Sequence, residues 1–320
     1  MNLDALPRID AASLESLMPI AKAIDVVEQL LGSGFDPEID PARQVLRVAA
    51  GDVLIMPAHT AQWIGVKVAT VAPGNPARDL PRVQALYVLI DALTLSPIAI
   101  FDGSALTTLR TPAVSAVAVR HLAPPDAAHL VLFGTGPQAW GHLVAICTVR
   151  PIERVTLVPR SRDRARPLAE RWRSSLGLHI EIGSPDAVAG ADVVACCTTA
   201  RTPLFAGELL PDSAVVVAIG SHEPDAREVD DKTVRRCSVV VEARAAALRE
   251  AGDVIGAIRS GALDADHLIG LADVVSGTAD LAPGPRLFKS VGMSWQDLAV
   301  AAAAYEASVR QSSHRRVGDG

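Results

Sequence analysis

The segment Leu130–Ala139 has the spacing best suited to chemistry. It reads LVLFGTGPQA, an apolar run followed by Gly134-x-Gly136-x-x-Ala139. Between a strand and a helix, Gly134 makes a tight turn, Gly136 lets a pyrophosphate approach the backbone, and Ala139 permits close helix packing. The helix N-terminus then offers amide donors and partial positive charge to the phosphates. We therefore predict a dinucleotide site here, which also includes Thr135 and Gln138.

The residues after the next apolar run bear on the choice of dinucleotide. The run RVTLV ends at Val158 and is followed by Pro159, Arg160, Ser161 and Arg162, with no acid before Asp163. An acid there would bind the ribose hydroxyls, whereas arginine accommodates a 2′-phosphate. The segment favours NADP(H), with NAD(H) as the alternative. A second interpretation is that these arginines form a solvated turn.

Lys67 and Arg110 are cations in apolar surroundings. Lys67 lies in the predicted strand of IGVKVATV, where an ammonium is costly unless it points into a polar site or snorkels from an edge strand. Arg110 begins a predicted helix of small and apolar residues, where a cation opposes the helix dipole unless it meets an anion. A carboxylate ligand or an intramolecular salt bridge would explain Arg110. Arg43, in PARQVL, is ambiguous on physical grounds alone.

The first part of the chain predicts one helix and then a sheet. Apolar residues recur at three- and four-residue spacing over residues 14–31, which indicates a single amphipathic helix. Short β-branched runs separated by turn residues fill positions 44–101 and predict a mostly antiparallel sheet. A helix is expected from about Thr107 to Leu122, and the tandem prolines after Ala123 indicate a domain boundary.

Beyond that boundary, strands and helices alternate. Apolar runs near residues 129, 154, 192, 214 and 237 alternate with helical segments, which predicts a doubly wound α/β domain with a parallel sheet. A final helix, expected over residues 295–309, follows the end of this pattern and is expected to return to the first domain. We therefore predict a substrate-binding domain of residues 1–124 with 294–320 and a dinucleotide-binding domain of residues 125–293.

Composition excludes several classes of protein. The 320 residues exceed what one hydrophobic core usually organises, and the net charge of −6 gives no electrostatic reason to bind nucleic acid or an anionic membrane. The four cysteines include no CxxC, and the histidines show no HExxH spacing, so no metal site is predicted. The cysteine pattern also fits no disulfide framework, so the expected location is the reducing cytoplasm. With neither a leader nor an 18-residue apolar stretch, a soluble, unprocessed protein is expected.

Ordered motifs along the chain resemble the ornithine cyclodeaminase and mu-crystallin family over nearly its whole length. They include PARQVL at 41, GVKVATVAPGNP at 65, LPRVQALYVLID at 80, FDGSALTTLRTPAVSAVA at 101, FGTGPQA at 133, EAGDV at 250 and LFKSVGMSWQDLA at 287. The resemblance implies an α+β substrate and dimerisation domain, a Rossmann domain and an active site in the cleft between them. It also implies a homodimer that acts on an amino or imino acid.

The resemblance also assigns roles to individual residues. It places carboxylate-binding arginines at Arg43 and Arg110, the active-site lysine at Lys67, and cofactor contacts at Thr198, Thr199 and Gly220 as well as at the glycines of the turn. The cyclodeaminases carry a catalytic aspartate at the position that His222 occupies here, where His222 is expected to contact substrate. The PDxRE ending at residues 224–228 is closer to the mu-crystallin branch.

Three functions follow as hypotheses. The first is an NAD(P)H-dependent reductase of a 2-imino acid, of ketimine reductase or amino acid dehydrogenase type, in which hydride reaches the imine carbon. The second is an NAD-dependent ornithine or lysine cyclodeaminase, which the absence of the aspartate disfavours. The third is a crystallin-like protein that binds a dinucleotide and a small ligand without turnover. We predict the first, with no nucleic-acid or membrane partner.

Overall fold

The computed structural model describes residues 6–220 and 222–318, with side chains up to residue 313. The chain divides into two compact units. Unit 1 comprises Met1–Leu30, Ile39–Thr111 and Met293–Gly320, and unit 2 comprises Leu31–Glu38 and Pro112–Gly292. These units differ from the predicted domains in two places. Leu31–Glu38 belongs to unit 2, and the division between the units lies after Thr111 rather than at the tandem prolines.

Unit 1 contains a six-stranded sheet in the order β1-β6-β5-β4-β3-β2. Every neighbouring pair is antiparallel except β1 and β6, which confirms the predicted mostly antiparallel sheet. The strands are β1 (Arg8–Ile9), β2 (Gln44–Val48), β3 (Gly51–His59), β4 (Trp63–Val71), β5 (Val83–Asp91) and β6 (Pro97–Asp102).

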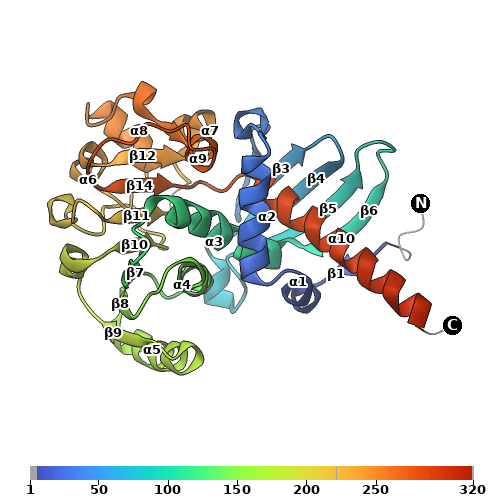
Figure 1. Ribbon diagram of the computed structural model, residues 1–320, viewed down its shortest axis with the longest axis horizontal. Coiled ribbons are helices and arrows are strands. Elements are labelled where there is room, and N and C mark those ends of the chain that lie inside the picture. Colours follow the sequence, from blue (N-terminus) through green and yellow to red (C-terminus); the bar gives the residue numbers. More distant parts are fainter. Residues whose placement is uncertain (1–5, 221, 319–320) are drawn as a thin grey trace. The chain divides into compact units, whose positions relative to one another are not determined.

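One face of this sheet is covered by the last helix, α10 (Ser294–Gly318), which packs on β3, β4 and β5. Figure 1 shows α10 running across the strands. Because side chains alternate between the faces of a strand, Lys67 in β4 points to the same face as its neighbour Tyr87 in β5. The fold therefore buries Lys67 on the face that α10 covers.

The amphipathic segment of residues 14–31 forms two helices rather than the single one predicted. These are α1 (Ala11–Leu17) and α2 (Ile20–Gly32). Pro19 separates them, because proline lacks an N–H and disfavours helical geometry in the preceding residue. Met18 accordingly has φ −137° and ψ 70°, outside the helical region.

The next helix, α3 (Gly103–Leu122), starts before the predicted Thr107. The Asp102 carboxylate accepts hydrogen bonds from the N–H groups of Ser104 at 2.9 Å and Ala105 at 3.0 Å. Such a cap satisfies N–H groups that lack partners within the helix. An acid at the end of a strand thus starts the helix one turn earlier than hydrophobic spacing predicts.

Unit 2 contains an eight-stranded parallel sheet in the order β13-β12-β14-β11-β10-β7-β8-β9. The predicted doubly wound α/β class is confirmed. The strands are β7 (His129–Phe133), β8 (Arg154–Val158), β9 (His179–Ile182), β10 (Val193–Cys196), β11 (Val215–Ala218), β12 (Ser238–Val241), β13 (Ile269–Gly270) and β14 (Arg286–Lys289).

Helices alternate with these strands along the chain. They are α4 (Pro137–Val149), α5 (Arg162–Leu176), α6 (Asp231–Arg236), α7 (Arg244–Glu250), α8 (Gly252–Arg259) and α9 (Leu271–Val275). Short 3-10 turns occupy η2 (Pro37–Ile39), η3 (Asn75–Arg78), η4 (Pro185–Gly190), η5 (Gly207–Leu209) and η6 (Ala265–His267). Throughout residues 6–220 and 222–318, every helix is too short or too polar for a bilayer span.

Candidate active site

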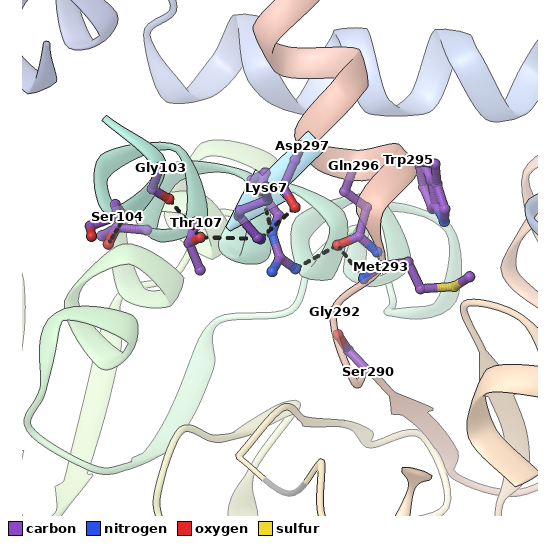
Figure 2. Close-up of polar contacts among 12 residues, drawn as sticks. Lys67, Gly103, Ser104, Thr107, Ser290, Gly292, Met293, Trp295, Gln296 and Asp297 are labelled. Atoms are coloured by element: carbon purple, nitrogen blue, oxygen red, sulfur yellow. Dashed lines mark hydrogen bonds and ion pairs between the residues drawn. The ribbon is translucent and has the colours of Figure 1, made fainter. Parts of the chain in front are cut away.

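Lys67 lies at the centre of a buried polar cluster in unit 1. Its ammonium contacts Asp297 Oδ2 at 2.5 Å and donates to Thr107 Oγ1 at 3.3 Å. Figure 2 shows the Lys67 and Asp297 side chains pointing toward one another, with Thr107 beside the ammonium. The Lys67 side chain is 2% exposed and that of Asp297 is fully buried. The sequence-based expectation that Lys67 points into a polar site agrees with this geometry.

Arg110 joins the same cluster from α3. Because α3 begins at Gly103, Arg110 lies well inside the helix and not at its N-terminus, so the expected conflict with the helix dipole is wrong. Its Nε donates to Asp297 Oδ1 at 3.3 Å and its Nη1 to Gln296 Oε1 at 2.7 Å. Within the described part of the chain, Nη2 makes no hydrogen bond. An intramolecular ion pair therefore accounts for only part of this guanidinium.

Asp297 and Gln296 were not singled out from the sequence. Both lie in the first turn of α10, where the helix dipole favours a carboxylate. The Trp295 N–H in the same turn donates to Asp40 Oδ2 at 3.0 Å, which ties this end of α10 to a loop. The sequence did contain a signal, because the polar pair Gln296-Asp297 directly precedes a run of small and apolar residues in the same helix. Spacing alone could not identify the partner of that acid.

The cluster carries more positive than negative charge. Lys67 and Arg110 share one hydrogen-bonded carboxylate, that of Asp297. Burial lowers the pKa of Lys67 to about 8; Asp297 opposes this shift, and the charges of Arg110 and Arg43 add to it. Arg43 therefore acts electrostatically on the same ammonium. A buried group with excess positive charge favours an anionic ligand.

Tyr87 places a neutral hydroxyl near this cluster. It pairs with Lys67 between β4 and β5, and it is 1% exposed. Burial raises its pKa well above the usual value, and the carboxylates of Asp297 and Asp40 add to the shift. Among the described residues, the hydroxyl has no hydrogen-bond partner. Tyr87 therefore remains protonated at neutral pH, and its contribution was not predicted from sequence.

In unit 2 the predicted dinucleotide turn follows β7. Gly134 has φ +111°, and a Cβ at this position would overlap the carbonyl oxygen of Cys197. Gly136 caps α4 without a side-chain hydrogen bond, and a Cβ added there meets nothing within 4 Å. Ala139 is fully buried against the sheet, while Thr135 is exposed and Gln138 half-buried. These residues fit a pyrophosphate at the helix N-terminus.

The residues predicted to meet a 2′-phosphate follow β8. Arg160, Ser161 and Arg162 are all exposed. Arg162 Nη2 donates to the Gly183 carbonyl at 3.1 Å, so this side chain is partly engaged by backbone. Arg160 makes no hydrogen bond or ion pair within the described ranges. Of the two arginines, Arg160 is therefore the better placed to accept a phosphate.

The loops after β10 and β11 contain the other predicted cofactor contacts. The backbone N–H and hydroxyl of Thr198 and the N–H of Gly220 all donate to the carboxylate of Glu228. Thr199 is exposed. Glu228 belongs to the PDxRE ending noted in the sequence, but its role as a common acceptor was not predicted.

His222 lies half-buried in the loop that follows β11. The contact of His222 with substrate stays a prediction. His222 belongs to unit 2, whereas the Lys67 cluster belongs to unit 1. In the ranges that the structure describes, no group of three or more His, Cys, Asp or Glu side chains could hold a metal ion.

Comparisons with known proteins give a consistent picture. Residues 10–312 match the ornithine cyclodeaminase/mu-crystallin family. The chain is 34% identical over 310 residues to a Δ1-pyrroline-2-carboxylate/Δ1-piperideine-2-carboxylate reductase of Azospirillum brasilense, covering 95% of this chain and 97% of that protein. It is 34% identical over 275 residues to the ketimine reductase mu-crystallin of Rattus norvegicus, covering 84% and 85%.

A solved structure is similar throughout. The Δ1-pyrroline-2-carboxylate reductase of Thermococcus litoralis, in complex with NADH and L-proline, has a TM-score of 0.90 at 30% identity, covering 96% of this chain and 98% of that one. The fold, the ordered motifs and the family match agree over nearly the whole length. This chain belongs to the ornithine cyclodeaminase/mu-crystallin family.

Proposed function

We propose that this protein is an NAD(P)H-dependent reductase of a 2-imino acid, with cyclic ketimine acids such as Δ1-pyrroline-2-carboxylate as the substrate class. The observation that carries the proposal is the buried Lys67, Arg110 and Asp297 cluster, which places two cations around one carboxylate. Similarity to reductases of such imino acids supports it. The same chemistry in reverse would be amino acid oxidation.

Arg110 and Arg43 are proposed to bind the substrate carboxylate. Arg110 is held by Asp297 and Gln296 through two nitrogens, which leaves Nη2 for a ligand oxygen. A guanidinium fixed in this way orients a planar carboxylate with little loss of side-chain entropy on binding. Fixing the carboxylate also fixes the neighbouring imine carbon, and such positioning contributes strongly to rate.

Lys67 is proposed as the proton donor to the imine nitrogen. With a pKa of about 8, the ammonium is mostly protonated at neutral pH yet releases its proton more readily than an exposed lysine. Asp297 orients the ammonium through the 2.5 Å contact and accepts no net proton in the reaction. Thr107 Oγ1 accepts a second hydrogen bond from Nζ.

A nicotinamide dinucleotide, when bound, supplies the hydride that adds to the imine carbon. The proposed contacts lie at the β7–α4 turn, after β8, and in the loops after β10 and β11. They are Gly134, Thr135, Gly136, Gln138, Ala139, Arg160, Ser161, Arg162, Thr198, Thr199 and Gly220. In this proposal unit 2 is the dinucleotide-binding domain and unit 1 binds the substrate.

NADP(H) is proposed as the preferred dinucleotide because Arg160 is exposed and uncommitted at the end of β8. The Thermococcus protein was solved with NADH, and NAD(H) is the alternative dinucleotide for this chain. Replacing Arg160 with glutamate should reverse the preference, since a carboxylate repels a 2′-phosphate and can bind ribose hydroxyls. Fluorescence titration with both reduced dinucleotides measures this. Tighter binding of NADH than of NADPH by the unmodified protein would contradict the arginine assignment.

A homodimer is also proposed, because the sheet face away from α10 is apolar and exposed. Leu46, Ile55, Val68 and Leu86 share this face and are 39–61% exposed. Val68 pairs with both Ile55 and Leu86, so the side chains form one patch. An apolar face of this kind on a soluble enzyme is typical of an interface between copies. Light scattering should give the mass of two chains, and a monomer at micromolar concentration would refute the homodimer.

We further propose that the enzyme is cytoplasmic.

The function is tested by a panel of substrates. Reduced dinucleotide should be oxidised with Δ1-pyrroline-2-carboxylate or Δ1-piperideine-2-carboxylate, or with 2-oxo acids plus amines, and one dinucleotide should be consumed per product. Ornithine and lysine should release no appreciable ammonia, because His222 occupies the position of the cyclodeaminase aspartate and supplies no carboxylate to hold a substrate ammonium. Binding of dinucleotide without turnover of any substrate would favour a non-catalytic role.

A further inference from the structure

A single buried carboxylate in unit 2 binds two separate loops. Glu228 Oε1 accepts from the Thr198 N–H at 2.9 Å and from its hydroxyl at 2.6 Å, and Oε2 accepts from the Gly220 N–H at 2.7 Å. Glu228 is fully buried. All three partners donate, so the ionised carboxylate is the form that satisfies them, since a protonated carboxyl presents a donor of its own.

The contact between the two loops and Glu228 requires a glycine at position 220. A Cβ at Gly220 would overlap the Thr198 carbonyl oxygen and would lie 2.5 Å from Glu228 Oε1. The two loops and the carboxylate therefore fit together only because residue 220 lacks a side chain. The position of each loop depends on the same acceptor.

These loops lie at the carboxyl edge of the parallel sheet, where the dinucleotide is proposed to bind. They follow β10 and β11, and β10 pairs with β7, whose Gly134 turn contacts the Cys197 carbonyl. Strands β8 and β9 lie on one side of β7, and β10 and β11 lie on the other, so the strand order reverses at this point. Ligands of doubly wound sheets bind outside the carboxyl ends of the strands at such a reversal.

Other charged groups face Glu228 from neighbouring elements. Lys289, at the end of β14, pairs with Asp253 Oδ2 of α8 at 3.1 Å, and both are fully buried. Asp253 Oδ1 accepts the N–H groups of Glu228 at 2.7 Å and Val229 at 3.0 Å. The thiols of Cys196 and Cys197, whose pKa values burial raises well above the usual range, remain neutral.

We propose that Glu228 is a positioning residue for the dinucleotide, whose carboxylate holds the Thr198 and Gly220 loops in the conformation that binds cofactor. This inference rests on the proposed function. Glu228 itself does not touch the cofactor, and it acts through the backbone of the two loops. Loss of its negative charge releases the loops and weakens dinucleotide binding.

The charge of Glu228 changes near neutral pH. Burial raises its pKa to about 7, Asp253 acts in the same direction, and Lys289, Thr198 and Gly220 oppose the shift. The binding-competent carboxylate therefore predominates above pH 7 and is lost as the pH falls below it. If binding needs the ionised form, the apparent Kd for dinucleotide rises about tenfold from about pH 8 to about pH 6.

The test is a fluorescence titration of the full chain with NADH across this pH range. NADH is the probe because it lacks the 2′-phosphate, which titrates near pH 6 itself. The unmodified protein should show the rise in Kd. Glu228→Gln should bind weakly at every pH, at the level that the unmodified protein reaches at low pH, because it cannot ionise. Glu153→Gln, an exposed carboxylate of unit 2, should behave like the unmodified protein. His222→Gln should keep the pH transition, which excludes that nearby imidazole as its source.

The outcomes separate this inference from the function itself. A Kd for the unmodified protein that is independent of pH, or a Glu228→Gln variant that binds NADH as well as the unmodified protein at pH 8, overturns the role of Glu228. If Glu228→Gln does not fold, the pH profile of the unmodified and His222→Gln proteins still decides. Failure of the unmodified protein to bind NADH or NADPH at any pH would instead refute the proposed reductase.

Discussion

Replacing Lys67 with methionine is expected to lower kcat for imine reduction about 10²- to 10⁴-fold, the range that a positioned proton donor contributes. Methionine is unbranched and fills much of the buried space of the lysine chain, but it has no proton to give. Dinucleotide affinity should not change, because the proposed cofactor contacts lie in unit 2. Steady-state kinetics with Δ1-pyrroline-2-carboxylate, together with a fluorescence titration of NADPH, separates the two effects.

The pH dependence of kcat gives an independent check on Lys67. Its lowered pKa of about 8 means that the protonated donor is present below this value and is lost above it. In the unmodified enzyme kcat should therefore fall above about pH 8, and the methionine variant should lack this decline. Lys22→Met, at an exposed lysine of unit 1, is the matched control. Near-normal kcat in Lys67→Met would remove this lysine from the chemistry.

Arg110→Ala is expected to raise KM for the imino acid about 10- to 150-fold, which corresponds to the roughly 1.5 to 3 kcal/mol of a charge-assisted hydrogen bond. The carboxylate of Asp297 would keep Lys67 as its remaining cation in the cluster. Arg43→Ala should act in the same direction. The affinity for dinucleotide should be unchanged in both variants. Steady-state kinetics measures KM for the imino acid, and fluorescence titration with NADPH measures the dinucleotide affinity.

A control distinguishes lost substrate contact from general damage. Arg310 is exposed in unit 1 and pairs with Glu306 on the surface of α10, so Arg310→Ala should leave KM and kcat unchanged. Removing one member of a buried ion pair also costs stability, so the melting temperature of Arg110→Ala should be measured beside its kinetics. An unchanged KM in folded Arg110→Ala would exclude this residue from the carboxylate site.

The parallel sheet and its turn could be read from the sequence because their signals are local. Strands such as β7, β10 and β11 are continuous apolar runs, as expected when both faces of a sheet are covered. By contrast, β14 has two charged residues among four, and its place between β11 and β12 depends on pairing with distant strands. The sequence pattern therefore appeared to end before the sheet was complete.

The candidate site was only half predictable, for a similar reason. Lys67 and Arg110 stand out as cations in apolar segments, but the acid that joins them lies 230 residues from Lys67 along the chain. Glu228 lies 30 residues from Thr198, in a loop with no periodic pattern. Local propensity identifies residues that are costly to bury, whereas the identity of a buried partner depends on tertiary packing.

Transfer of deuterium tests the proposed reaction itself. The enzyme should be incubated with NADPH deuterated at the transferable position of nicotinamide C4 and with Δ1-pyrroline-2-carboxylate, and the product analysed by mass spectrometry and NMR. Hydride addition to the imine carbon predicts proline carrying one deuterium at C2 and an equal amount of oxidised dinucleotide. Proline formation and ammonia release from ornithine, with no net oxidation of NADPH and no labelled proline from the imine, would contradict a ketimine reductase.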